Sequence, residues 1–227
     1  MEKAKVYFTD FRTNSNQNLL QKLRRLLQKA GMMQMPLDGK FTAIKIHFGE
    51  PGNLAFLRSN YARVVVDALK EIGARPCLTD SNTLYPGMRR NALDHIDAAY
   101  MNGFSPLQTG CHVIIADGLL GTDFVSVPIK GEYCDHALIG RAAVDAEAVI
   151  SLTHFKCHEG TGIGGALKNL GMGLGSTAGK REMHCDGKPT VDEDGCVGCG
   201  MCIKQCGSDA ITMVQMPKGR KAVIDHD

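Results

Sequence analysis

The stretch FTAIKIHFGEPGNLAFLRSNYARVVVDALKEIGARPCLTD, residues 41–80, predicts the fold of most of this chain. It opens with FTAIKIHFG, an apolar run with β-branched residues that is typical of a buried strand. Residues 57–73 then show the apolar spacing of a helix, which Gly73 ends. RPCLTD predicts the next strand. A strand, a helix and a second strand in succession indicate parallel pairing, because parallel neighbours need a crossover connection.

The same alternation extends to both sides of this unit. Further strands are predicted at residues 5–10, 112–119 and 123–130, and helices at residues 14–31, 91–104 and 135–155, the last one leading into another apolar strand. We therefore predict an α/β fold, a mostly parallel sheet with helices on both faces, over residues 1–187. Residues 188–227 are predicted to form a small ferredoxin-like domain that is incomplete at its C-terminus.

That second domain is predicted from CVGCGMCIKQC, which starts at Cys196. Three thiolates at CxxCxxC spacing in a glycine-containing loop can hold a 4Fe-4S cluster, and a fourth cysteine three residues later completes the bacterial ferredoxin pattern. Zinc is the alternative, but zinc sites usually separate two CxxC pairs by a dozen or more residues. The predicted metal ligands are Cys196, Cys199, Cys202 and Cys206.

The last cysteine of this pattern usually ligates a second cluster. Residues 211–227, ITMVQMPKGRKAVIDHD, have the alternation of a hairpin, and in two-cluster ferredoxins such a hairpin lies between the two motifs. We therefore expect a second cysteine motif beyond residue 227. Without it, the fourth ligand of the first cluster would have to be Cys206 itself or Cys185.

Composition narrows the possible functions. The net charge of the 227 residues is only +2, so no broad basic face suggests nucleic-acid binding. No signal peptide or apolar run of membrane-spanning length is evident, and we expect a cytoplasmic protein. In a cytoplasmic protein, nine cysteines are better explained by metal binding than by disulfides. Cluster-bearing proteins of this kind are commonest in anaerobes. The scattered cysteines are interpreted mostly as small buried hydrophobic residues: Cys77, Cys111, Cys134 and Cys157.

Polar residues follow three of the predicted strands, where open α/β sheets bind ligands. The period of two places Lys45 and His47 on the same side of their strand, close to Glu50. The next strand ends in Asp80, Ser81 and Asn82, and a later one in Asp117. Each cluster is predicted to bind a ligand, or alternatively only to satisfy its own turn.

A fourth cluster lies in THFKCHEGTGIGGALKNLGMG, residues 153–173. An extended segment would place His154, Lys156 and His158 on one side, followed by a glycine-rich turn and then by Lys168 and Asn169. Glycines let backbone amides approach an anion, and the start of the following helix adds positive potential. We predict a site for a carboxylate, a phosphate or a metal-linked cofactor. The alternative is a tight crossover with exposed histidines.

Five stretches together resemble the iron-sulfur branch of the domain-of-unknown-function family 362: IKIHFGEPGN, LTDSNTLY, IIADGL, SLTHFKCHEGTGIGGALKNLGMG and the cysteine motif. The resemblance covers essentially the whole chain. It implies an α/β domain that bears a 4Fe-4S ferredoxin domain, typically with two cluster motifs. It implies no particular reaction.

The shorter stretch HFKCHEGTGIGGALK is also similar to part of the nickel-pincer lactate racemases, in which imidazole and lysine groups serve a tethered nickel cofactor and its hydroxy acid. This similarity implies catalytic or cofactor-holding roles for His154, His158 and Lys168. The residues expected to bind a cofactor or substrate are Lys45, His47, Asp80, Asn82, Lys156 and Asn169.

Two functions follow as hypotheses. In the first, the α/β domain binds a small anionic substrate or cofactor and the cluster exchanges electrons with it and with a redox partner protein. In the second, the cluster is structural or sensory, and the α/β domain is a binding or scaffold module without redox turnover.

Overall fold

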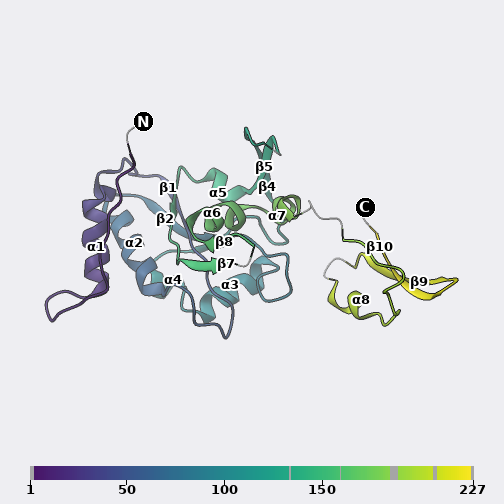
Figure 1. Cartoon of the computed structure of the whole chain (residues 1–227). Helices are drawn as coiled ribbons and strands as arrows, with labels where there is room; N and C mark the ends of the chain where they lie inside the picture. The colour runs from purple at the N-terminus through teal and green to yellow at the C-terminus, as the bar shows by residue number, and fades with distance from the viewer. Residues whose placement is uncertain (1–2, 133, 159, 185–188, 207–208, 226–227) are drawn as a thin grey trace.

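The computed structural model describes residues 3–132, 134–158, 160–184, 189–206 and 209–225 (Figure 1). Its centre is a four-stranded parallel sheet with the strand order β3-β2-β1-β6. The strands are β1 (Phe41–Lys45), β2 (Arg75–Asp80), β3 (Val113–Ile115) and β6 (Ala148–Ser151). The predicted α/β fold is thereby confirmed, with the strand–helix–strand unit of residues 41–80 at its core.

Helices flank the sheet, as predicted. Ile44 of β1 belongs to the same buried cluster as Val65, Val66 and Leu69 of α2 (Ser59–Glu71). Side chains alternate along a strand, so the next residue, Lys45, points to the opposite face, where it contacts α6 (Ala166–Leu174). The other helices of this part are α1 (Leu19–Lys29), η1 (Met32–Gln34), α3 (Ala92–Met101), α4 (Pro106–Thr109), α5 (Arg141–Asp145) and α7 (Thr177–His184).

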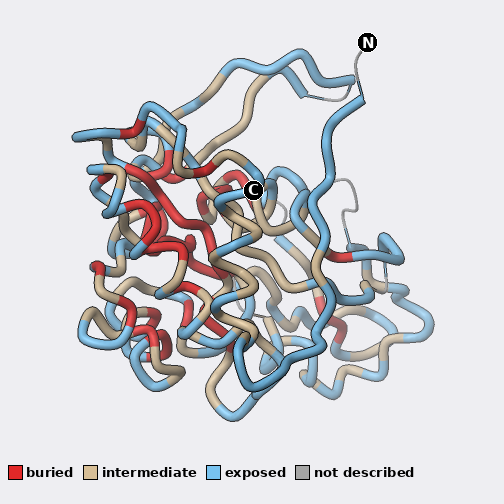
Figure 2. Tube along the Cα trace, turned by 90° about the vertical axis from the view of Figure 1, so that its left-hand side faces the viewer, coloured by how far each residue is buried: buried red, intermediate tan, exposed pale blue. Residues whose placement is uncertain are grey.

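The main hydrophobic core lies between the sheet and α2. It includes Ile44, Leu78 and Phe104, each with no exposed surface. Figure 2 shows most of the buried segments together on the left of the view, with shorter buried stretches on the right. A smaller cluster around Ala116, Ala143 and Leu174 packs on the α6 side. The sheet is therefore covered on both faces, which explains why its strands are almost continuously apolar.

Two expectations about local structure are wrong. The segment at residues 5–10 is not a strand, and its side chains Val6 and Phe8 are 89% and 85% exposed. The segment expected to be a helix from residue 135 begins instead with a strand, β5 (His136–Gly140), which pairs with β4 (Phe124–Pro128) in an antiparallel hairpin. Apolar runs can form either element, and here the neighbouring strand decided the outcome.

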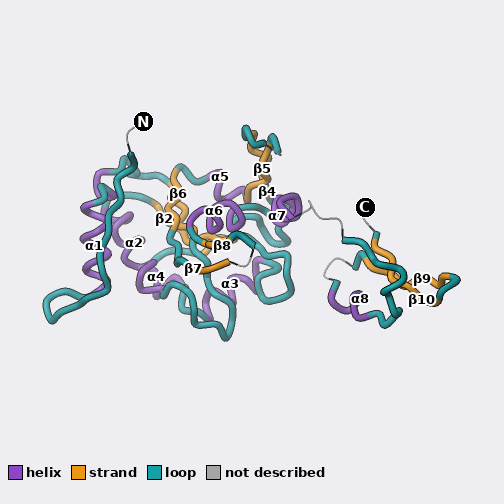
Figure 3. The backbone as a smooth tube through the Cα atoms, viewed as in Figure 1, coloured by secondary structure: helices purple, strands orange, loops and turns teal. Residues whose placement is uncertain are grey.

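Two further hairpins complete the chain (Figure 3). The first, β7 (Lys156–His158) with β8 (Gly162–Gly164), precedes α6. The second, β9 (Ile211–Met216) with β10 (Gly219–Ile224), follows the short helix α8 (Met201–Gln205) and confirms the predicted C-terminal hairpin. Within the described residues after 188, only Lys221 and Ala222 are buried. We call residues 189–225 the C-terminal unit; it has almost no hydrophobic core.

Among the helices of the described segments, none combines the length and the apolarity that crossing a membrane requires.

Candidate functional site

The strand order reverses direction at β1, since β2 and β3 lie on one side of it and β6 on the other. Open α/β sheets bind ligands at such a switch point, beyond the carboxyl ends of the strands. A pocket of about 620 Å³ lies there, and we call it the switch-point pocket. Its wall combines the ends of β1, β2 and β6 with residues of β7, β8, α6 and α7. Ligand pockets in proteins commonly have volumes in this range.

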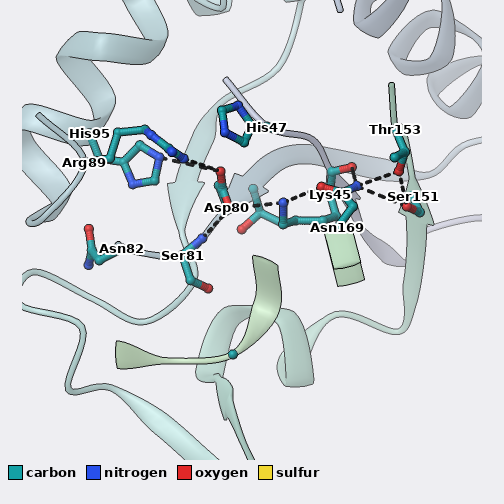
Figure 4. A network of polar contacts seen from close by, with 12 residues as sticks. Lys45, His47, Asp80, Ser81, Asn82, Arg89, His95, Ser151, Thr153 and Asn169 are labelled. Carbon is teal, nitrogen blue, oxygen red and sulfur yellow. Dashed lines mark hydrogen bonds and ion pairs between the residues drawn. The ribbon is translucent and has the colours of Figure 1, made fainter. Parts of the chain in front are cut away.

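Lys45 is the central cation of this pocket and is 1% exposed. Its Nζ lies 3.1 Å from Asp80 Oδ1 and donates to Asn169 Oδ1 at 2.8 Å (Figure 4). The amide nitrogen of Asn169 donates in turn to Thr153 Oγ1 at 2.8 Å and to Ser151 Oγ at 3.1 Å. Three strand ends and α6 are therefore joined through one lysine. Burial lowers the pKa of Lys45, and the Asp80 carboxylate opposes this shift.

Asp80 lies beside three basic side chains. Beside Lys45, its Oδ2 lies 3.3 Å from Arg89 Nη1 and 3.7 Å from His95 Nε2. Burial alone would raise the pKa of Asp80, but Lys45, His95 and Arg89 together hold it well below its usual range. Arg89 also pairs with Glu50 through Nε at 2.7 Å. Asp80 is therefore an anion that orients positive groups, and its charge is already neutralised.

His47 lies on the pocket wall as a neutral imidazole. Its Nδ1 accepts a hydrogen bond from the backbone N–H of Gly49 at 2.9 Å, so the ring proton is on Nε2. Burial and, next, the charge of Arg89 lower its pKa to about 4. At neutral pH His47 is thus a hydrogen-bond donor rather than a cation.

A second buried lysine, Lys180 of α7, closes the pocket from the side of the connector. Its Nζ donates to the backbone oxygens of Asn82 and Gly175, each at 2.7 Å, and burial lowers its pKa to about 8. The Asn82 side chain itself turns away and donates to Asp117 Oδ1 at 3.0 Å. Burial raises the pKa of Asp117.

The β7–β8 hairpin and the start of α6 supply the outer wall. His154, Lys156 and Lys168 line the pocket, together with Gly164 and Gly165. His158 does not line it; its Nε2 contacts Lys168 Nζ, and its Nδ1 accepts the backbone N–H groups of Gly160 and Thr161. His158 therefore positions Lys168 through this contact and does not face a ligand in the pocket itself.

The structure thus brings most of the predicted site residues together. Those that line the pocket are Lys45, His47, Asp80, His154, Lys156, Lys168 and Asn169, whereas Asn82 and His158 stand behind the wall. Sequence reasoning missed Arg89, His95 and Lys180. Arg89 stands in the polar loop after β2, and a buried partner for Asp80 could have been sought there. His95 and Lys180 lie within helices without a local signal, because only the tertiary fold brings them to the strand ends.

The predicted metal ligands belong to the C-terminal unit. Gly198 and Gly200 adopt left-handed backbone conformations with φ of 69° and 70°, which turn the chain between the cysteines. Cys196 Sγ accepts the backbone N–H of Ala222 at 3.5 Å, and the N–H groups of Ala222 and Gly198 lower the pKa of this thiol. Cys199 and Cys202 are exposed and Cys206 is half-buried. Within the described segments, no three His, Cys, Asp or Glu side chains are grouped closely enough to hold a metal ion.

The remaining cysteines only partly match their interpretation as buried residues. Cys111 is buried and Cys77 is half-buried, and burial raises the pKa of Cys77 to about 11. Cys134 and Cys157 are exposed, because they lie in or beside hairpins that project from the sheet. Cys185, the alternative fourth cluster ligand, lies outside the described residues.

The family model for the domain of unknown function DUF362 matches residues 42–222, which takes in the sheet, the pocket and the cysteine motif. The chain belongs to the DUF362 family. Searches of curated proteins and of solved structures gave no match. The DUF362 match begins at β1 and includes both candidate sites.

Proposed function

We propose that this DUF362 protein is an iron-sulfur protein of the electron-transfer or oxidoreductase class, whose switch-point pocket binds a small anionic substrate or cofactor. The observation that carries the ligand half of this proposal is the charge of the pocket wall. Among the described residues, its lining contains one carboxylate, Asp80, against five cationic side chains: Lys45, Arg89, Lys156, Lys168 and Lys180. In a partly enclosed site such an excess favours anions.

The cluster half rests on the donor set of the C-terminal unit. Three cysteines at CxxCxxC spacing, with turns at Gly198 and Gly200, are the donor types that a 4Fe-4S cluster requires, and two backbone N–H groups favour deprotonation of Cys196. Their side chains would have to draw together on binding, since they are not grouped closely enough to hold a metal ion in the described structure. Cys196, Cys199 and Cys202 would hold it, with Cys206 as a further ligand of the same or a second cluster. When bound, the cluster would supply one-electron transfer.

A short stretch of chain joins the pocket to the C-terminal unit. His184 lines the switch-point pocket, and Pro189, the first described residue after it, lies five residues further along. Five extended residues span at most about 18 Å. Cys196 lies twelve residues after His184, which allows a separation of at most about 43 Å. Electron exchange requires the cluster to approach the pocket more closely than this limit, while the lysines of the pocket would hold the anionic ligand.

A second candidate function is favoured by the small core of the C-terminal unit. With only Lys221 and Ala222 buried after residue 188 in the described segments, the unit needs another source of stability, and a bound cluster could supply it. In that case the cluster would be structural or sensory, and the α/β domain would bind its ligand without redox turnover.

Metal analysis tests the first half of the proposal. The chain would be purified and reconstituted under anaerobic conditions, and iron, sulfide and zinc would be measured together with the EPR spectrum after dithionite reduction. About four irons per chain and a reduced-cluster signal are expected. Cys199→Ser should lose them, whereas Cys134→Ser, at an exposed cysteine of the β4–β5 hairpin, should not. Zinc alone, or no metal, would overturn the cluster assignment.

Ligand binding tests the second half and separates the two candidate functions. Calorimetric titration with small carboxylates should show binding that weakens in Lys168→Gln. If a bound carboxylate shifts the reduction potential of the cluster, the two sites are coupled and the redox function is supported. If cluster loss and ligand binding are independent, the structural or sensory role is supported instead. Absence of carboxylate or phosphate binding would refute the anion pocket.

A further inference from the structure

In the part of the chain that the structure describes, two residues that line the switch-point pocket carry buried hydroxyl groups without a hydrogen-bond partner. Ser81 and Thr83 follow β2, are 1% and 7% exposed, and line the pocket. Their Oγ and Oγ1 atoms are buried and have no hydrogen-bond partner among the described residues. A buried hydroxyl without a partner costs about 1–3 kcal/mol. Hydroxyls in such a position are therefore suited to donate to a bound group.

Two buried lysines in the same pocket have unused donors. An ammonium group carries three N–H groups. Lys45 uses two of them on Asp80 and Asn169, and Lys180 uses two on the carbonyls of Asn82 and Gly175. Asp80 pairs with both Lys45 and Arg89, so its single negative charge does not balance the positive charges at the β2 end of the pocket. We call Lys45, Lys180, Ser81 and Thr83 the deep subsite.

The outer end of the pocket carries a separate positive region. Lys156 is exposed and Lys168 is half-buried beside His158. Gly165, the residue before α6, lines the pocket at the same end, so the positive end of that helix adds to their charge. We call Lys156, Lys168 and the start of α6 the outer subsite. The remaining lining includes the apolar side chains of Leu57, Leu84, Leu152 and Met172.

We propose that the ligand of this pocket is a small organic molecule with two anionic groups, one bound in the deep subsite and the other in the outer subsite, joined by a short apolar spacer. This inference rests on the proposed anion-binding function and specifies its ligand class. A ligand with one anionic group would either leave the hydroxyls of Ser81 and Thr83 without a partner or leave the positive charge of the outer subsite unbalanced. The anionic groups are carboxylates or phosphates, since both accept several hydrogen bonds from lysine and hydroxyl donors.

The test compares matched pairs of probes by calorimetry on the full chain: malonate, succinate and glutarate against propionate, butyrate and valerate. The best dicarboxylate should bind at least about tenfold more tightly than the monocarboxylate with the same number of carbons, because a second charged group adds its own hydrogen bonds. Phosphonoacetate is the phosphate arm. If phosphonoacetate binds more tightly than malonate, the result still supports a ligand with two anionic groups, and it indicates that one of these groups is a phosphate.

Two sets of variants assign the subsites. Ser81→Ala combined with Thr83→Val, and separately Lys168→Gln, should each weaken the best dicarboxylate about tenfold. Ser126→Ala, at an exposed serine of β4, is the matched control and should change nothing. The paired hydroxyl substitution should also leave thermal stability without ligand unchanged or raised, since no protein hydrogen bond is lost. A fall in stability would show that the hydroxyls are structural.

The two proposals fail in different ways. Equal affinity for monocarboxylates and dicarboxylates, or hydroxyl variants with unchanged dicarboxylate affinity, would overturn the two-group ligand while the anion pocket stands. Failure of every carboxylate and of phosphonoacetate to bind would overturn both.

Discussion

In the switch-point pocket the charged groups are held by partners from the protein, whereas the cysteines of the C-terminal unit have almost none. Lys45, Asp80 and Arg89 are fixed by one another and by Asn169. In the C-terminal unit, Cys199 and Cys202 are exposed, and Cys196 is contacted by backbone N–H groups, that of Ala222 at 3.5 Å. The pocket is therefore organised by folding itself. If the proposed cluster binds, it would define the final geometry of the cysteine loop, and this contrast between the two regions can be tested in each of them.

Removal of metal should have the largest effect, and only on one region. If a cluster supports the C-terminal unit, chelation of iron from the reconstituted protein should abolish amide protection in β9 and β10, because the unit buries only Lys221 and Ala222 there. Amides of β1 and β2 should keep their protection. Hydrogen exchange with mass spectrometry measures both regions at once. Equal protection of β9 and β10 with and without metal would show that the unit folds without it.

Asp80→Asn should destabilise the α/β domain by about 3–5 kcal/mol, because it leaves Lys45 buried without its anion and removes one of the two carboxylates that pair with Arg89. Urea unfolding followed by circular dichroism measures the change. The matched control is Asp67→Asn, which breaks the exposed ion pair with Arg63 and should cost no more than about 0.5 kcal/mol. Similar losses in both variants would mean that the pocket charges do not depend on one another.

The low pKa of His47 predicts how stability changes with pH. The unfolded chain protonates this imidazole below about pH 6.5, and the folded chain only near pH 4. The folded state therefore binds fewer protons between these values. Its stability is complete above pH 6.5 and should fall by up to about 3 kcal/mol as the pH falls to 4. Unfolding titrations at several pH values should show a shallower dependence in His47→Gln; the same slope as in the unsubstituted protein would contradict the burial of a neutral His47.

Gly173→Ala should have the smallest effect of the four. A Cβ at this position of α6 would overlap Cε and Nζ of Lys45, which is held by Asp80 and Asn169, and the crowding should cost about 1–3 kcal/mol. Gly171→Ala, two residues earlier in the same helix, meets no neighbouring atom and should stabilise by up to about 1 kcal/mol. Thermal unfolding compares the pair. If both variants gain stability, Lys45 is free to move aside.

The elements that sequence could predict are those whose signals are local. Helix α1 is predicted by its leucine spacing, but it begins at Leu19, where Asn18 and Gln21 form a capping box, and not at residue 14 as expected. The strand β1 follows from its β-branched apolar run. Residues 5–10 carry a similar apolar signal, yet no strand among the described residues pairs with them. Because a strand is stable only with a partner, these residues do not form one.

The site could be predicted as a set of strand ends but not as a network. Lys45 and Asp80 were recognisable because each ends an apolar strand. The hydrogen bond between Lys45 and Asn169 joins residues that are 124 positions apart in the sequence. It depends on the close approach of α6 to Lys45 at Gly173. Arg89 and Lys180 join the site only through loop and helix packing. Long-range contacts of this kind leave no periodic pattern in a single sequence.

Helix α7 is the last described element before the C-terminal unit, so any force on that unit reaches the α/β domain through it. Its start is fastened by Thr177, whose hydroxyl donates to the carbonyl of Gly121, and its middle by Lys180, which holds the carbonyl of Asn82 at the end of β2. Any tension that the C-terminal unit exerts on the connector is passed to α7, which is held by these two contacts and by Glu182, whose carboxylate lies 3.4 Å from His136 Nε2. Because Lys180 also lines the switch-point pocket, a force on the C-terminal unit acts directly on the wall of that pocket.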